Sequence, residues 1–469
     1  MGLAFLILLY DLAFPNTNKK ILSYVAGILL ALIGILIWQT SPTETEIFGR
    51  DIMVFDSFSR FFFVVFVSIG SITMIMSAKL LENREGGAEY LALILFSVVG
   101  AMGMAAAHEL ITAYISLELL TFTLYVLVGF SWKKKRSNEA ALKYILMGAV
   151  ASAFLLFGIS YIYGITGSTH YNVISNVMSD GTTPIMLVGI ALLTVGVGFK
   201  IAAVPFHMWT PDAYEGAPIP ISGYLATGSK AAALALVIRL SSSVYSEIID
   251  SWSVIFLTLA VASMVLGNLV AIRQSNMKRL MAYSSIGQVG FFLLGIAAFS
   301  STEPENIVAG LLIHSVSYAI STLAVFLVMT IIFVETGKED IDDYSGLSQR
   351  NSLLAVVLTA SLFSLAGFPF FIGFSSKFYL FTTIGMAGNH FIFFVGIAIL
   401  ASVISVFYYL KIIKKIYIDE PNIGNENIIK VNYASRVLLI LLTIFLGVGG
   451  LYIAPLAELA EGAARNVFL

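Results

Sequence analysis

Two lysines lie inside apolar stretches of this chain, on either side of a segment that contains proline. The sequence from 195 to 230 reads VGVGFKIAAVPFHMWTPDAYEGAPIPISGYLATGSK, with Lys200 before Pro205 and Lys230 at its end. An ammonium group near the middle of a bilayer costs on the order of 2.5–3.5 kcal/mol by the lower estimates. A proline removes a helical hydrogen bond and clashes with the preceding turn. Two such lysines beside a broken helix indicate a place where protons or ions are handled.

Other ionisable residues lie in similarly apolar surroundings. Glu118 is in the middle of AYISLELLTFTLYVL, Lys143 lies in NEAALKYILMGAV, and Lys377 lies in a third apolar stretch. Snorkelling or a static ion pair explains a single residue of this kind, such as Lys143 or Arg239 taken alone. Four buried titratable groups are too costly to serve only as contacts between helices. We therefore interpret this set as a proton relay: Glu118, Lys200, Lys230 and Lys377.

His314 is a further candidate because an imidazole titrates near neutrality. It either conducts protons or only donates to a carbonyl, and the sequence leaves both open. His207, at the break, is better explained as a capping or structural residue. Polar residues that would fit a hydrated path between the lysines are Thr194, Thr227, Ser229, Ser284, Ser285, Gln288, Ser315, Ser317 and Tyr318.

The composition is that of a membrane protein. Of the 469 residues, 58% are hydrophobic and 12% charged, whereas a soluble domain carries roughly 25% charge. The chain has no cysteine, which excludes disulfides, thiolate-held zinc and cysteine-ligated iron–sulfur clusters. No nucleotide-binding motif or metal-ligand spacing occurs. We expect neither cofactor nor metal in this chain, and a lipid bilayer rather than nucleic acid as its surroundings.

Apolar runs of about 20 residues predict fourteen transmembrane spans in an all-α protein. The first is shorter than a full span, so we expect either a poorly tilted helix or a start upstream of Met1. We divide the chain into three N-terminal helices (1–88), two five-helix repeats (89–248 and 249–418) and a last helix (419–469). The predicted spans are 2–14, 21–39, 57–78, 89–106, 109–130, 138–165, 184–204, 218–244, 251–272, 278–298, 306–334, 351–386, 391–416 and 434–453.

The two sets of five helices resemble each other in one respect. The fourth helix of each carries a central Pro-Phe break, AAVPFH at 202–207 and AGFPFF at 366–371, with Lys200 or Lys377 nearby. A set of five spans reverses direction across the membrane, so the repeats would be inverted. Interrupted helices in corresponding positions of two inverted repeats are typical of transporters, with the pathway near the breaks.

The distribution of basic residues predicts the orientation. With the N-terminus outside, 18 of the 26 lysines and arginines fall in or beside cytoplasmic loops, and only Arg50 and Arg465 fall on the outer side. The positive-inside rule therefore predicts that both termini lie outside. The run Lys133–Arg136 is best explained as a topology anchor.

Four segments resemble the antiporter-like subunits of respiratory complex I, which are related to multisubunit sodium/proton antiporters. They are residues 198–230, MKRLMAYSSIGQVGF at 277–291, LAGFPFFIGFSSKFYLF at 365–381 and ELITAYISLELLTFTLYVLVGF at 109–130. Two features favour the N type over the L and M types. The chain ends soon after its last span, without a long lateral helix, and Tyr318 stands where antiporters have a basic residue four positions after His314.

The resemblance implies roles for the individual residues. Glu118 would be the glutamate that pairs with Lys200 at the first break. Lys230 would be the connecting lysine and Lys377 the lysine of the exit half-channel. Lys143 would be an additional lysine of N-type subunits, which we add to the predicted proton relay.

The resemblance also implies partners. FMN, iron–sulfur clusters and quinone would be held by other subunits, and the neighbours would be M-, K- and J-like subunits and the lateral helix of an L-like subunit. The chain would lie in a prokaryotic plasma membrane.

Three hypotheses remain open at this point. The first is a proton-translocating subunit of a complex I-type enzyme, with NADH, reduced F420 or ferredoxin as electron donor. The second is a subunit of a cation/proton antiporter that is not coupled to redox chemistry. The third is a structural membrane subunit whose buried charges only hold helices together.

Overall fold

Helices make up almost all of the computed structural model, which describes residues 1–40, 46–47, 52–82, 84–301, 303–421, 427–465 and 467. The first half contains α1 (Gly2–Ala13), α2 (Lys19–Gln39), α3 (Ser57–Leu81), α4 (Gly87–Ala106), α5 (Leu110–Val128), α6 (Lys135–Thr166), α7 (Tyr171–Ser179), α8 (Pro184–Ile201), α9 (Trp209–Gly216), α10 (Ile219–Tyr224), the π-helical turn η1 (Leu225–Ser229) and α11 (Lys230–Ser242).

The second half continues with η2 (Ser246–Ile248), α12 (Ile249–Ala271), α13 (Met277–Ala297), η3 (Ala298–Ser300), α14 (Pro304–Thr336), η4 (Ile341–Tyr344), α15 (Leu347–Arg350), α16 (Ser352–Ala366), α17 (Ile372–Met386), α18 (Asn389–Tyr417), α19 (Tyr433–Leu451) and α20 (Ala454–Ala464). Two short strands, β1 (Glu46–Ile47) and β2 (Met53–Val54), pair in antiparallel fashion.

The prediction of an all-helical, multi-pass membrane protein is confirmed. Within the described ranges, 12 helices are long and apolar enough to cross a bilayer, and each coincides with one of the fourteen predicted spans. The other two predicted spans differ from the expectation of a single long helix. The first is the 12-residue helix α1, and the span predicted over 351–386 is divided into α16 and α17.

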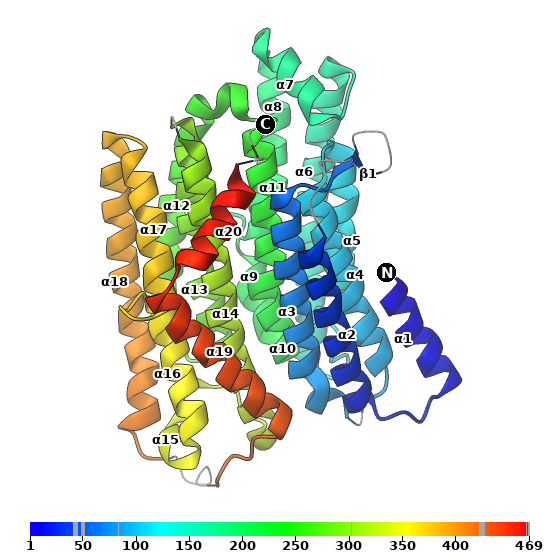
Figure 1. Ribbon diagram of the computed structural model, residues 1–469, viewed down its shortest axis with the longest axis vertical. Coiled ribbons are helices and arrows are strands. Elements are labelled where there is room, and N and C mark those ends of the chain that lie inside the picture. Colours follow the sequence, from blue (N-terminus) through cyan, green and yellow to red (C-terminus); the bar gives the residue numbers. More distant parts are fainter. Residues whose placement is uncertain are drawn as a thin grey trace.

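The most buried helices lie at the centre of the molecule. Every residue from 219 to 241, the stretch of α10, η1 and α11, is buried, and α13 and α14 are nearly as enclosed. Large apolar side chains remain exposed on α2, α6 and α18, for example Leu32, Phe157 and Phe393. In Figure 1 the long helices run roughly upright, with α18 at one edge of the molecule and α1 at the other. An apolar exterior around a polar interior suits a bilayer.

Both predicted breaks are present. Helix α8 ends with Ala202 in the left-handed region (φ 66°), and α9 begins only at Trp209. Helix α16 ends with Gly367 in the same region (φ 87°), and α17 begins at Ile372. A left-handed residue stops a helix because the next N–H groups turn back to its last carbonyls, and each proline cannot continue it.

Four α-helices lie outside the predicted spans, namely α7, α9, α15 and α20. The short α7 follows α6, and α20 follows the last predicted span. In Figure 1, α19 and α20 lie obliquely across the upright helices, and α20 packs against α3 and α14. The division of the chain into four parts and the inverted symmetry of the two repeats remain predictions.

Candidate functional site

Lys200 is buried at the end of α8, where only 2% of the residue is exposed. Its ammonium group donates to the hydroxyl of Thr121 on α5 over 2.6 Å. No other hydrogen-bond acceptor contacts Lys200 Nζ among the described residues. A buried cation with a single neutral partner is poorly compensated for the loss of water, which is the state expected of a group that exchanges its proton.

Neighbouring helices satisfy the backbone of the first break. The indole of Trp209 donates to the carbonyl of Phe199 at 2.9 Å, and the hydroxyl of Ser263 accepts from the N–H of Val204 at 3.0 Å. Buried backbone groups without partners are costly, so these two contacts keep the broken helix stable inside the membrane. The sequence contains no local signal for either contact, since Ser263 comes from α12.

Glu118 lies one helical turn before Thr121 on the same helix, but it does not form an ion pair with Lys200. The hydroxyl of Ser152 on α6 donates to the carboxylate of Glu118. Glu118 is close enough to Lys200 to interact with it electrostatically. The predicted pairing of Glu118 with Lys200 is therefore a through-space interaction in this structure, and not a contact.

Lys230 begins α11 directly after the π-helical turn η1 and is 1% exposed. Its ammonium donates to Ser285 on α13 at 2.8 Å, and Ser285 in turn donates to the carbonyl of Ala282. Within the part of the chain that the structure describes, no carboxylate forms an ion pair with Lys230. Its position agrees with the interpretation of Lys230 as a member of the relay.

Helix α13 links Lys230 to the second half of the relay. Gln288, one turn after Ser285, contacts His314 on α14, with 3.2 Å between Gln288 Oε1 and His314 Nε2. The other ring nitrogen of His314, Nδ1, lies 3.1 Å from the hydroxyl of Ser376 on α17. Both ring nitrogens thus have side-chain partners, so the alternative in which His314 only donates to a carbonyl is not what the structure shows.

Lys377 follows Ser376 and lies at the second break. Its ammonium donates to the carbonyl of Leu365 at 2.8 Å and to the hydroxyl of Ser402 at 2.9 Å. An apolar cavity of about 530 Å³ borders Lys377, and the strongly exposed Phe378 forms part of its wall. The second break therefore opens toward the surface of the chain beside its lysine. At the first break Met208 is exposed, but Lys200 is enclosed.

Lys143 lies apart from the buried residues Lys200, Lys230, His314 and Lys377. Its side chain is 45% exposed and forms ion pairs with Glu139 at 2.8 Å and Asp212 at 2.9 Å. The structure does not bring Lys143 into contact with any other member of the predicted relay. Its role in proton transfer stays a prediction that the geometry does not support.

Asp212 belongs to an ionic cluster around α9, which we define as Arg136, Lys143, Asp212, Glu215 and Arg279. Arg279 on α13 contacts Asp212 at 2.7 Å and Glu215 at 2.8 Å, and Arg136 on α6 contacts Glu215 at 3.1 Å. Burial alone would raise the pKa of Asp212, but the hydrogen bonds from Arg279 and Lys143 outweigh it and lower the pKa below its usual value. The cluster ties the two halves of the chain together.

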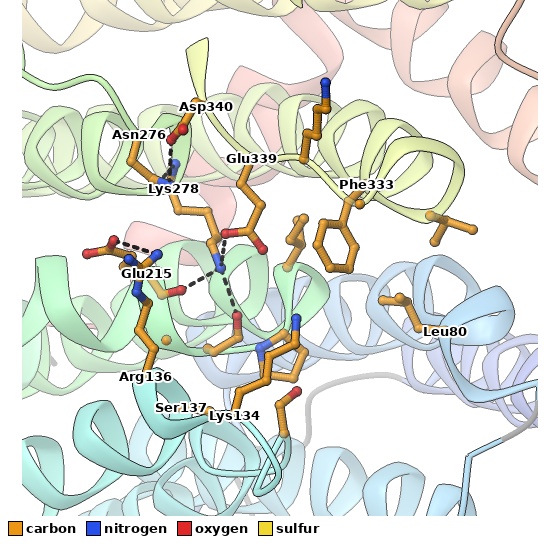
Figure 2. Close-up of a pocket in the computed structure, with 18 of the residues that line it drawn as sticks. Leu80, Lys134, Arg136, Ser137, Glu215, Asn276, Lys278, Phe333, Glu339 and Asp340 are labelled. Carbon is orange, nitrogen blue, oxygen red and sulfur yellow. Dashed lines mark hydrogen bonds and ion pairs between the residues drawn. The ribbon is translucent and has the colours of Figure 1, made fainter. Parts of the chain in front are cut away.

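Beside the ionic cluster lies a charged cavity of about 1060 Å³, shown in Figure 2. It is bordered by the ends of α3, α9, α13 and α14 and by the segment between α5 and α6. Seven of the basic residues that the topology assigns to the cytoplasmic side line it: Lys79, Arg84, Lys134, Lys135, Arg136, Lys278 and Lys338. Their convergence agrees with a common side for these residues, although the orientation in the membrane remains a prediction.

Arg239 is explained by a static ion pair. It contacts both carboxylate oxygens of Asp56 at 2.7 and 2.6 Å and donates to the carbonyl of Ala105 at 3.0 Å. Both side chains are almost fully buried. This bidentate pair holds α3, α4 and α11 together. No group of side chains suited to a metal ion occurs among the described residues.

Comparison with known proteins agrees with this geometry. Residues 107–405 match the family model described as the transmembrane region of NADH:quinone oxidoreductase and Mrp antiporter subunits. The chain belongs to this family. Its relatives include NADH-quinone oxidoreductase subunit N of Desulforamulus reducens, 37% identical over 472 residues that cover 100% of this chain and 96% of the relative.

Solved structures of related subunits have the same fold. A chain of respiratory complex I from Thermus thermophilus superposes with a TM-score of 0.81 at 27% identity, covering 98% of both chains. A chain of the archaeal membrane-bound sulfane sulfur reductase superposes with a TM-score of 0.85 at 26% identity, over 99% of this chain and 95% of that one.

A chain of the Mrp complex from Dietzia also superposes, with a TM-score of 0.80 over 98% of this chain and 95% of that one, but at 21% identity it supports the fold alone. The resemblance inferred from the four sequence segments is thereby confirmed. Members of this NADH:quinone oxidoreductase and Mrp antiporter family occur in membrane assemblies of either type.

Proposed function

We propose that this chain is a proton-translocating membrane subunit of a complex I-type NADH:quinone oxidoreductase. The observation that carries the proposal is a series of buried polar side chains between Lys230 and Lys377. Ser285 accepts from Lys230, Gln288 one turn later contacts His314, and His314 contacts Ser376, the residue before Lys377. The relative from Desulforamulus reducens, which matches over the full length of this chain, supports the assignment to the oxidoreductase rather than to the antiporter.

The proposed chemistry at Lys200, Lys230 and Lys377 is the exchange of a proton on a buried amine. Each ammonium donates to oxygen atoms, and the hydroxyls of Thr121, Ser285 and Ser402 can accept a proton and pass one on. A change in the separation of Glu118 and Lys200 alters the proton affinity of Lys200. A proton then moves by way of Lys230 to Lys377, which releases it outward.

The energies involved are compatible with this scheme. Moving one charge against 100 mV costs about 2.3 kcal/mol. A change of one pKa unit corresponds to about 1.4 kcal/mol, so a change of one or two units in a lysine is of the required size. The redox chemistry that drives the change takes place in other subunits of the proposed assembly.

The proposed surroundings follow from the same assignment. FMN, iron–sulfur clusters and quinone belong to partner subunits, and the immediate neighbours are M-, K- and J-like membrane subunits and the lateral helix of an L-like subunit. The chain lies in a prokaryotic plasma membrane with both termini outside.

The test is to purify the assembly from native membranes and to compare it with a Lys200→Met variant reconstituted in lipid vesicles. We expect an assembly with flavin and iron–sulfur absorbance, NADH:quinone reductase activity and proton uptake that falls at least tenfold in Lys200→Met. Lys411→Met, at an exposed lysine on α18, is the matched control and should pump normally.

Two outcomes would contradict the proposal. A small assembly without redox cofactors and with sodium-dependent transport would identify an antiporter subunit. Normal pumping in Lys200→Met, together with impaired assembly but normal pumping in Glu118→Gln, would mean that the buried charges only hold helices.

A further inference from the structure

Lys278 is a buried lysine that the relay does not use. It lies in the first turn of α13, is 2% exposed and borders the charged cavity. Its ammonium makes three contacts: with the carboxylate of Glu339 at 2.9 Å, with the carbonyl of Glu215 at 2.5 Å and with the carbonyl of Ala217 at 3.2 Å. Figure 2 shows these contacts converging on Lys278 between the two groups of helices.

The two carbonyls belong to the end of α9 and the residue that follows it, in the first half of the chain. The C-terminus of a helix carries partial negative charge, so a cation is stabilised there. Glu339, in contrast, belongs to the second half, between α14 and η4. Lys278 therefore connects the segment between α9 and α10 to the opposite half of the molecule.

The backbone fixes Glu339 and Lys278 relative to each other. The N–H of Met277 donates to the carbonyl of Glu339 at 3.2 Å, and the N–H of Ile341 donates to the carbonyl of Ser275 at 2.9 Å. The side chain of Asn276 caps α13 by accepting from the N–H of Lys278 at 3.0 Å. Both members of the ion pair are held in this way, so the contact that can change is the one between Lys278 and the segment 215–218, whose Glu215 side chain also pairs with Arg279 and Arg136.

A polar route leads from this segment to Lys230. Lys278 and Ser285 are seven residues apart on α13, which places them on the same face about two turns from each other, and Ser285 accepts from Lys230. The buried hydroxyl of Tyr214 on α9 lies near Ser285 without forming a hydrogen bond of normal geometry. Residues 216–219 line the charged cavity on one side and continue into α10 and Lys230 on the other.

We propose that Lys278 and Glu339 are a positioning pair. The pair holds residues 215–218, which border the charged cavity, in place and thereby controls the access of protons from the cavity to Ser285 and Lys230. The inference rests on the proposed function for the identity of the transported ion. While Lys278 holds the carbonyls of Glu215 and Ala217, the segment between α9 and α10 seals the relay from the cavity. Loss of the ion pair with Glu339 frees the ammonium and allows the segment to move.

The test measures water access directly. Because the chain has no native cysteine, a single cysteine can be introduced by Ser222→Cys, one turn past Pro218 on α10. Ser222 is fully buried and donates to the carbonyl of Tyr214 at 2.7 Å. The complete assembly in inverted membrane vesicles is treated with the small impermeant cation methanethiosulfonate-ethyltrimethylammonium, and the mass shift of this chain is followed in time.

We expect Glu339→Gln in this background to increase the labelling rate about tenfold, and Lys278→Met to do the same. Lys135→Met is the matched control, because Lys135 is an exposed lysine that lines the same cavity, and it should stay within twofold of the parent. Glu339→Gln is decisive, since electrostatics alone predicts slower labelling by a cation when a negative charge is removed.

An unchanged or slower rate in Glu339→Gln would overturn the inference. The same variant should retain quinone reductase activity within twofold while the steady pH gradient falls at least threefold, a combination that a general loss of stability would not produce. If Lys200→Met pumps normally the proposed function fails, whereas the labelling rates test the positioning pair independently of pumping.

Discussion

The two broken helices hold their lysines in different ways. At the first break, neutral groups satisfy the backbone, since Trp209 donates to the carbonyl of Phe199 and Ser263 accepts from Val204. At the second break the neutral hydroxyl of Ser402 donates to the carbonyl of Ala366, but the lysine also takes part, because Lys377 donates to the carbonyl of Leu365 at the end of α16. A proton can leave Lys200 without altering its break, whereas loss of a proton from Lys377 weakens a contact on which its break depends.

The largest expected effect comes from removing the single partner of Lys200. Thr121→Val keeps the shape of the side chain but leaves a buried ammonium without an acceptor, which costs about 1.5–3 kcal/mol for a hydrogen bond to a charged group. We expect proton pumping in reconstituted assemblies to fall roughly tenfold or more. Ser402→Ala is the comparison at the second break, and it should cost about threefold or less because Lys377 retains Leu365. Equal effects of the two substitutions would remove the distinction between the breaks.

A second comparison concerns the residue with left-handed backbone conformation at each break, Ala202 at the first and Gly367 at the second. Gly367→Ala places a side chain at φ 87°, and its Cβ would lie 3.2 Å from Lys377 Cδ and 3.4 Å from Nζ. We expect a loss of about 1–2 kcal/mol in stability, seen as a lower melting temperature of the assembly. The mirror substitution, Ala202→Gly, relieves a non-glycine residue at φ 66° and should be neutral or slightly stabilising. If Ala202→Gly were the more harmful, the strain argument would be wrong.

The smallest expected effect is on the pH dependence of stability. The pKa of Asp212 is lowered in the folded chain, so its ion pairs contribute their full stability above the unfolded pKa of about 3.9. This contribution declines as the pH falls from there through the lowered folded pKa. Asp212→Asn should lower stability at pH 7 by about 1 kcal/mol or less, since the pair is partly exposed.

In a melting experiment the difference from the parent should shrink below about pH 4. Asp342→Asn, which affects an exposed ion pair with Lys415, is the control and should change the melting temperature less. A difference between Asp212→Asn and the parent that is as large at pH 3 as at pH 7 would show that Asp212 acts through packing rather than charge.

The sequence predicted the features that are revealed by one residue type in unfavourable surroundings. Lysines in apolar runs and prolines in long spans are visible without a structure, and the breaks beside Lys200 and Lys377 were found in this way. The partners were not, because Thr121 and Ser402 are common small polar residues that lie 79 and 25 positions away from their lysines. Which of many serines and threonines faces a lysine depends on helix packing.

For two lysines, the sequence indicated the wrong degree of burial. Lys143 resembles the buried lysines in its apolar sequence context, but it lies on an exposed face of α6 and pairs with Asp212. Lys278 resembles an ordinary loop residue that marks one side of the membrane, yet it is buried. Hydropathy averages over a helix, whereas burial depends on the face, and α6 and α13 differ in how much of their circumference other helices cover.

The π-helical turn η1 has a consequence for comparing this chain with its relatives. A π turn accommodates one residue more than an α turn, because its hydrogen bonds run from residue i to residue i+5. The extra residue is taken up within 225–229, so the helix after it keeps Lys230 directed toward Ser285. A relative with a one-residue gap at this position in an alignment should therefore have a regular α turn there and still present its connecting lysine to the same neighbour.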